Sequence, residues 1–266
     1  MKKILFSGGA LMLFLVAAAQ QKQGTVNYDR TAQMKMRINT GQGDEEKQQT
    51  RTDKFELSFA NNKSLWKQAE KENDDQGGSD GGGGGMQIHM IVAGSDDVLF
   101  NDFSAGKSTQ LHVVFDKNFI VDDSIHSLKW KMGEETKTIL GHNCHKATTT
   151  TINTRTMMNI NNGVMERKPV QDTAMITAWY ADDIPIAAGP AEYQGQLPGL
   201  ILALDINNGK SVYQATAITE KTDVAAIKEP AGKKHYTPAE FKTERDKMMD
   251  EMQKNNGGGN RRIRMN

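Results

Sequence analysis

Apolar and polar residues alternate over several segments of this chain, and this alternation limits the fold more than any other feature. A period of two residues places one face of a strand in a core and the other in water, which is typical of antiparallel sheets. The sequence therefore predicts a mainly β protein, built on a curved antiparallel sheet that meanders like half of a barrel. The alternating apolar residues are Val26, Tyr28, Ala32, Met34, Met36 and Ile38, then Phe55, Leu57 and Phe59, then Leu111, Val113 and Phe115.

Turn residues separate the apolar runs, and Asn208-Gly209 is the strongest hairpin signal among them. A type I′ turn needs positive φ at both central residues, and asparagine followed by glycine meets that need. This turn is expected to join a strand over 200–206 to a strand over 212–218. The sheet is therefore expected to be a long meander within one domain over residues 20–236.

One amphipathic helix is predicted over residues 237–254. Thr237 and Glu240 have the spacing of a capping box, and Pro238 stands at the first helical position. The helix is expected to pack on the sheet along a stripe, and residues 255–266 are expected to form a disordered basic tail. The stripe consists of Phe241, Met248, Met249 and Met252.

The N-terminus has the pattern of a secretory signal peptide over residues 1–19. Lys2 and Lys3 precede a mostly apolar run, and three alanines at 17–19 form a cleavage site. The apolar run is shorter than the roughly 20 residues that cross a bilayer, so the mature chain is expected to lack a transmembrane anchor. We expect an exported protein of the periplasm, of the outer-membrane face or of the medium.

Two segments are too polar or too rich in glycine to cover a core. The residues near 39–53 include no apolar side chain, and those near 71–85 end in five consecutive glycines. Both compositions are typical of flexible loops.

The charge balance argues against a nucleic-acid partner. The chain has 33 Lys and Arg against 33 Asp and Glu. Binding to phosphates needs a basic face that releases counterions, and a mixed, neutral surface does not supply one.

A segment rich in proline and glycine leads into the strand that begins near Leu200. Proline fixes φ and lacks an N–H donor, whereas glycine accepts tight turns, so the segment predicts a rigid corner. A packed corner is the favoured interpretation, and a ligand groove is the alternative. Two adjacent aromatic residues are expected to point to opposite faces of their strand, one into the core and one outward. The block consists of Trp179, Tyr180, Pro185, Gly189, Pro190, Leu197, Pro198 and Gly199.

This block, with residues 130–132 and 138–148, resembles the GLPGLI family of exported proteins from Bacteroidetes-type bacteria. The resemblance covers about residues 20–255. Gln196 stands in place of the first glycine of the Gly-Leu-Pro-Gly-Leu-Ile motif that gives the family its name, and Gly195 lies one position earlier. The resemblance implies export and an association with outer-membrane receptor and transport systems, and it implies no agreed activity.

The sharpest chemical motif is His142-Asn143-Cys144-His145. A thiolate with one or two imidazoles suits copper or zinc, so His142, Cys144 and His145 are candidate metal ligands. The simpler interpretation is favoured: Cys144 is a small buried side chain and the two histidines lie on an exposed strand surface. As the only cysteine, Cys144 has no partner for an internal disulfide.

No spacing of acidic, histidine or nucleophilic residues points to catalysis, so the sequence favours a non-enzymatic role. We expect an exported binding or interaction protein of the cell envelope, with an apolar or lipidic ligand or an outer-membrane protein as partner. The alternative is a copper- or other metal-handling accessory that uses His, Cys and Met ligands.

Overall fold

The computed structural model describes residues 22–39, 44–69, 97–114, 117–161 and 164–257. Within these ranges the chain forms strands, two short 3₁₀ turns (η1, Ala191–Tyr193, and η2, Val224–Ala226) and one long helix, α1, over Pro238–Gly257. The strands are β1 (Gly24–Asn39), β2 (Asp44–Ala60), β3 (Lys63–Gln68), β4 (Val98–Asp102), β5 (Lys107–Val114), β6 (Lys117–Ser124), β7 (Lys131–Ile139), β8 (His142–Asn161), β9 (Val164–Ala181), β10 (Leu200–Ile206), β11 (Ser211–Thr219) and β12 (His235–Tyr236).

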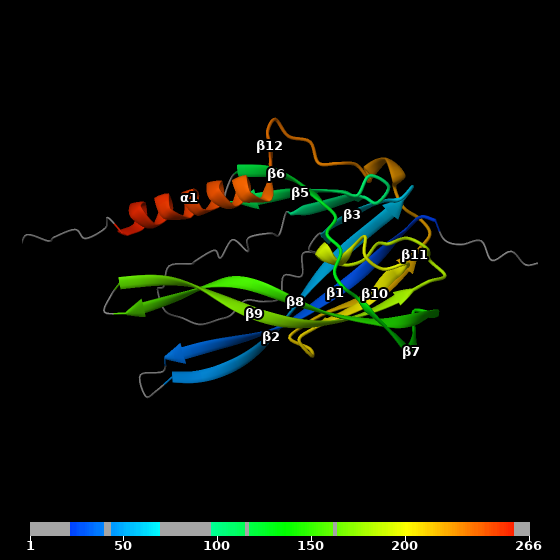
Figure 1. Ribbon diagram of the computed structural model, residues 1–266, viewed down its shortest axis with the longest axis horizontal. Coiled ribbons are helices and arrows are strands. Elements are labelled where there is room, and N and C mark those ends of the chain that lie inside the picture. Colours follow the sequence, from blue (N-terminus) through cyan, green and yellow to red (C-terminus); the bar gives the residue numbers. More distant parts are fainter. Residues whose placement is uncertain (1–21, 40–43, 70–96, 115–116, 162–163, 258–266) are drawn as a thin grey trace, which may run out of the picture.

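The strands of the described residues form one open, twelve-stranded sheet in the order β12-β6-β5-β4-β3-β2-β1-β11-β10-β9-β8-β7. Two meanders build it, since β1 to β6 pair in sequence and β7 to β11 pair in sequence. Antiparallel pairing of β1 with β11 joins the two halves. The short strand β12 adds to β6 in parallel. The predicted fold class, a curved antiparallel meander with a packed C-terminal helix, is confirmed (Figure 1).

The main core lies where the two meanders meet. Val26, Tyr28, Leu57 and Phe59 of the first meander are fully buried against β10, whose residues 200–204 are all buried. Strand β10 is therefore a nearly continuous apolar run, unlike β11, where buried Tyr213 and Ala215 alternate with more exposed residues. Burial of each large side chain of this kind contributes about 1.5–3 kcal/mol.

Asparagine-rich turns set the register of the hairpins. Asn61 and Asn62 have φ of 52° and 57° between β2 and β3, and Asn207 and Asn208 have φ of 55° and 51° between β10 and β11. Asparagine tolerates this left-handed backbone better than most residues. The hairpin predicted at Asn208-Gly209 is confirmed.

The capping box of α1 forms as predicted. The backbone N–H of Thr237 donates to Glu240 Oε2 at 2.8 Å, and the N–H of Glu240 donates to Thr237 Oγ1 at 3.3 Å. Phe241 is buried against β6, and Met248 packs beside it. Met249 differs from the prediction because 41% of it is exposed, so the contact stripe of the described helix residues is narrower than expected.

The described residues of one predicted loop belong to strands. Residues 39–53 were expected to be flexible, but Asp44–Asp53 belong to β2 and pair with β1 along their whole length. The ladder of backbone hydrogen bonds does not require apolar side chains, so a polar two-stranded ribbon extends beyond the core. In Figure 1 the hairpins β1–β2 and β8–β9 both extend to the left, below α1.

Several predicted segments lie outside the described residues. These are the signal peptide at 1–19, the glycine-rich loop near 71–85 and most of the tail at 255–266. Across the part of the chain that is described, no helix has the length and apolar character that crossing a membrane requires.

Candidate functional site

The inner face of the curved sheet holds a groove of about 650 Å³. Residues of β3 to β6 form its floor. Its sides come from Ile125 and Leu128, from the loop that carries Tyr193, and from α1; Thr151 of β8 also lines it. A groove of this size falls within the range of small-molecule sites.

A row of small polar side chains crosses the floor of the groove. Backbone pairing places Ser64, Asn101, Ser108 and Asp123 opposite one another on four successive strands. The Ser64 hydroxyl donates to Gln194 Oε1 at 2.6 Å. Asn101 is only 3% exposed, and its Nδ2 has no hydrogen-bond partner among the described residues. Leaving such an atom without an acceptor lowers the free energy of unfolding by about 1–3 kcal/mol.

The next row along the strands is mostly apolar. Pairing places Trp66, Leu99, Gln110 and Val121 side by side. The Trp66 ring stacks on Phe55, with ring centroids 4.9 Å apart and an angle of 10° between the planes. The groove therefore offers hydrogen bonds along one row and apolar contact along the next.

A histidine joins the groove to the helix. His112 Nδ1 lies 2.8 Å from Asp97 Oδ2, which fixes the orientation of the imidazole. The same ring stacks on Phe241 of α1, with centroids 4.4 Å apart and nearly parallel planes. Asp97 also accepts the backbone N–H of Val113 at 3.0 Å. The stack of His112 on Phe241 holds the first turn of α1 at the edge of the groove.

The rigid corner predicted from proline and glycine forms one side of the groove. Tyr193 and Gln194 are buried there, and Gly195 has φ of 76° in a place where a side chain would overlap Ile125. Gln196 ties the corner to the segment that crosses the inner face, because its Oε1 accepts from the Leu128 backbone N–H at 3.1 Å and from Trp130 Nε1 at 3.0 Å. In this chain the glycine-dependent bend lies at 195, and residue 196 has a separate hydrogen-bonding role.

The remaining residues of the block divide between core and surface. Gly189, Pro190, Leu197 and Gly199 are buried, whereas Pro185 and Pro198 are exposed. A side chain at 199 would overlap the carbonyl oxygen of Ala181, so only glycine allows this approach of two backbones. This set acts in packing, and it carries Tyr193 and Gln194 to the groove.

Trp179 and Tyr180 point to opposite faces of β9, as predicted. Tyr180 is buried on the inner face, where its ring lies 5.9 Å from that of His145. Trp179 is half-buried on the outer face, and Lys137 Nζ lies 4.4 Å from its ring centroid. Neither residue is among those that line the groove.

The three candidate metal ligands do not converge in the structure. All three lie in β8, so His142 and Cys144 share one face and His145 the other. His142 Nδ1 contacts Asp183 Oδ2 at 2.7 Å, and His145 Nε2 lies 3.4 Å from Asp182 Oδ2. The Cys144 thiol donates to the His142 carbonyl at 3.7 Å, and burial raises the pKa of this thiol to about 11. Each side chain thus has its own partner within the described chain.

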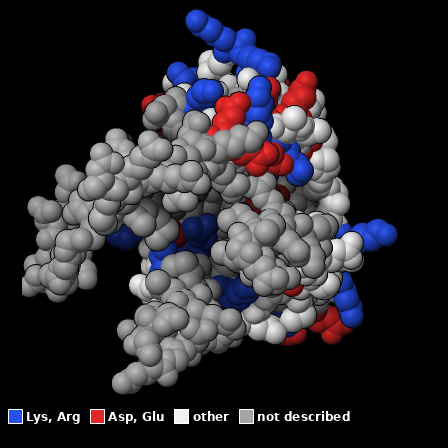
Figure 2. All heavy atoms as spheres, turned by 90° about the vertical axis from the view of Figure 1, so that its left-hand side faces the viewer, with Lys and Arg blue, Asp and Glu red and all other residues white. Residues whose placement is uncertain are grey.

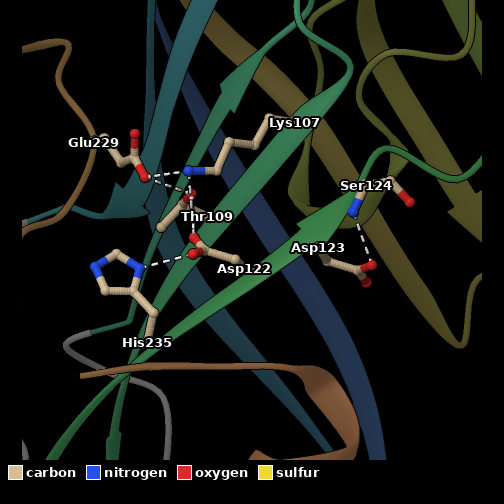
Figure 3. Close-up of polar contacts among 7 residues, drawn as sticks. All are labelled: Lys107, Thr109, Asp122, Asp123, Ser124, Glu229 and His235. Atoms are coloured by element: carbon tan, nitrogen blue, oxygen red, sulfur yellow. Dashed lines mark hydrogen bonds and ion pairs between the residues drawn. The ribbon is translucent and has the colours of Figure 1, made fainter.

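Another group on the outer face of the sheet does bring potential ligands together. Oxygen and nitrogen atoms of Asp122, Glu229 and His235 lie within 4.8 Å of one another (Figure 3). Lys107 already supplies a positive charge there, since its Nζ lies 2.6 Å from Glu229 and 3.6 Å from Asp122. Partial burial raises the pKa of Asp122, but hydrogen bonds from His235 and Thr109 and the charge of Lys107 bring it below its usual value. This cluster fastens the segment before α1 to the sheet.

Charges of both signs are mixed on the surface. Figure 2 shows Lys and Arg side chains beside Asp and Glu over the described part of the visible face. No large area of one sign is visible among those residues.

The groove residues were not identified from the sequence. Asn101 and His112 belong to the paired strands β4 and β5, but Thr151 belongs to β8, and the curvature of the sheet brings it to the same cavity. A usable signal was present, however, since Ser108, Gln110 and His112 place polar side chains on the inner face of β5, where an alternating strand should be apolar.

No curated protein matches the chain. Two solved structures, of PNGF-II in space groups C2 and P21, are similar with TM-scores of 0.48 and sequence identities of 18% and 16%. Each alignment covers 84% of this chain but 33% and 32% of the PNGF-II chain, so this chain spans about a third of their length. Residues 130–203, which contain both the His-Cys-His motif and the rigid corner, match a family described as a protein of unknown function (Porph_ging).

Proposed function

We propose that this chain is an exported, non-enzymatic binding protein of the cell envelope, and that its ligand occupies the groove on the inner face of the sheet. The observation that carries this proposal is the buried amide of Asn101, which lines the groove and has no partner in the described chain. Folded proteins pair nearly all such atoms, so an unpaired one in a residue that lines a cavity favours a ligand site there.

The build of the groove supports binding in preference to catalysis. Two of the carboxylates that line it, Asp97 and Asp123, contact His112 and His126, and His112 is stacked on Phe241. A general acid or base needs access to a reacting group, whereas these side chains are engaged in holding the walls together. Trp66, Leu99 and Val121 supply the apolar surface that retains an organic ligand.

The resemblance to the GLPGLI family supports the cellular context of this proposal. Membership of that family entails export and an association with outer-membrane receptor and transport systems. The family match at 130–203 covers the corner that forms one side of the groove. A carrier or accessory protein that presents a small ligand to an outer-membrane partner fits both observations.

The proposal is tested by extracting the mature chain from the cell envelope and identifying co-purified small molecules by mass spectrometry. Ser108→Trp fills the floor of the groove and should remove the bound compound. Glu220→Trp adds the same ring at an exposed site and serves as the matched control. Circular dichroism confirms that both variants fold. Equal recovery of the compound from the two folded variants would exclude the groove as its binding site.

A further inference from the structure

Two residues that line the groove each have a buried polar side-chain atom without a hydrogen-bond partner in the described part of the chain. These atoms are Nδ2 of Asn101 and Oγ1 of Thr151. Asn101 belongs to β4 and Thr151 to β8, and seven steps in the strand order separate these strands. Both residues nevertheless line the same cavity. The curved sheet therefore brings an unpaired donor of one half and an unpaired hydroxyl of the other half into the walls of one groove.

Most of the charged groups of the groove already contact a polar or charged neighbour. Asp97 contacts His112 at 2.8 Å, and Asp123 contacts His126 at 3.0 Å. Lys242 and Arg245 of α1 each lie 3.3 Å from Asp246. A charged ligand would have to break one of these pairs or enter without a counter-ion, and burial of an unpaired charge is costly. The groove is thus suited to a neutral ligand.

The groups that remain for a ligand both donate and accept hydrogen bonds. Ser108 and Gln110 lie beside Asn101 on the floor and make no side-chain hydrogen bond to any residue that the structure describes. The amides of Asn101 and Gln110 and the Ser108 hydroxyl lie at neighbouring positions. Together with the Thr151 hydroxyl from the other half of the sheet, they require a partner that can donate and accept at several points. Hydroxyl groups do both, whereas an acyl chain does neither. The apolar row at Trp66 and Leu99 matches the C–H faces of such a molecule.

We propose that the ligand is a neutral, polyhydroxylated molecule, a mono- or disaccharide, which Asn101 and Thr151 hold from the two halves of the sheet. This inference rests on the proposed binding function and names its ligand class. It replaces the apolar or lipidic ligand expected from the sequence, because the floor of the groove carries too many hydrogen-bonding groups for a hydrocarbon chain.

The test is isothermal titration calorimetry of the mature chain with glucose, galactose, mannose, N-acetylglucosamine and their disaccharides. Oleate and trialanine are titrated as representatives of the lipid and peptide classes. At least one sugar should bind saturably. Asn101→Leu and Thr151→Val should each lower the affinity for that sugar by about tenfold or more, the cost of one buried hydrogen bond to a ligand. Asn143→Leu and Thr150→Val make the same changes at exposed positions and should leave the affinity unchanged.

Thermal unfolding separates a ligand contact from a structural one. Without sugar, Asn101→Leu should unfold at the same temperature as the parent chain or a higher one, since it removes a buried atom that lacks a partner. With sugar, only the parent chain and the exposed controls should gain stability. A fall in the unfolding temperature of Asn101→Leu without sugar would show that the amide has a structural role instead.

The outcomes distinguish the ligand class from the binding function. If no sugar binds but oleate or trialanine does, and Ser108→Trp abolishes that binding, the saccharide assignment is wrong and the groove function stands. If a sugar binds equally to the parent chain, Asn101→Leu and Thr151→Val, the assignment is also wrong. If none of the probes binds and no compound co-purifies with the protein, both proposals fail and an ordered water molecule explains the unpaired atoms.

Discussion

The hydroxyl of Tyr28 donates a 2.6 Å hydrogen bond to the backbone carbonyl of Ile201. These residues lie in β1 and β10, which are not neighbours, since β11 runs between them. Both ends of the contact coincide with irregular pairing, between Asn27 and Tyr28 in β1 and between Ile201 and Ala203 in β10. Irregular pairing releases a carbonyl from the ladder, and the tyrosine supplies its donor. The contact thus joins the two meanders at the centre of the core.

Tyr28→Phe should lower the free energy of unfolding by about 1–3 kcal/mol, because the Ile201 carbonyl would remain buried without that donor. Urea unfolding at neutral pH measures the change. Tyr236→Phe makes the same substitution at a half-buried position and should cost less than half as much. Equal losses in the two variants would show that the tyrosine hydroxyl does not hold the bulges together.

A buried carboxylate should make the sheet sensitive to acid. Asp53 accepts from Arg30 at 2.6 Å and from Arg51 at 2.7 Å. Burial raises the pKa of Asp53, but the two guanidinium groups outweigh it and hold the pKa below the usual 3.8. A lowered pKa means that the stabilisation is complete above about pH 4 and is lost as the pH falls through the folded-state value.

At pH 7 the free energy of unfolding, measured with urea, should therefore be about 1–3 kcal/mol higher for the parent chain than for Asp53→Asn. This difference should shrink below pH 4. Asp29→Asn, on the neighbouring strand, provides a control for the loss of one charge. A difference between Asp53→Asn and the parent chain that stays constant down to pH 2 would contradict the pairing with the arginines.

The sequence predicted the local structure well because local structure depends on neighbouring residues. Alternation around Val26 and Tyr28 indicated a strand, Asn208-Gly209 indicated a hairpin, and Thr237 with Glu240 marked the start of α1. The polar ribbon at 44–53 was missed because backbone pairing with β1 leaves no apolar pattern in the sequence.

The polar inner face of β5 was a signal for part of the groove, but the whole groove was not predictable, since it depends on contacts between distant strands. Nothing in the sequence near Asn101 or Thr151 indicates that the two halves of the sheet curve toward each other. The His-Cys-His motif illustrates the opposite case: residues adjacent in sequence suggested a site, and the geometry of a regular strand separated them onto two faces. The turn at Leu140 and Gly141 ends just before the motif, so it cannot bring the three side chains together.

The Cys144 thiol should be protected from reagents in the native protein. It is fully buried, and its pKa of about 11 leaves about a thousandth of it as thiolate at pH 8. Reaction with 5,5′-dithiobis(2-nitrobenzoate) at pH 8 should be at least about a hundredfold slower in buffer than in about 6 M guanidinium chloride, a concentration that unfolds most domains.

A rapid native reaction would show that the thiol is accessible and ionised, which is the state that a copper site requires. Cu(I) binding measured on Cys144→Ser and His142→Ala completes this test, since a metal site at the motif would lose affinity in both variants.

The corner should depend on the absence of a side chain at residue 199. A Cβ at this position would overlap the carbonyl oxygen of Ala181, and because the obstacle is backbone, no rotamer change relieves the overlap. Gly199→Ala should therefore lower the free energy of unfolding by about 1–3 kcal/mol or more. Gly133→Ala adds the same methyl group in β7, where the nearest atom lies 3.4 Å away, and should cost much less.

Residue 199 ends the loop that carries Tyr193 and Gln194. Gly199→Ala should therefore also lower the affinity of the groove for any ligand, whereas Gly133→Ala should not. Equal stability and affinity in the two variants would show that the corner adapts to a side chain and does not hold the groove rigidly.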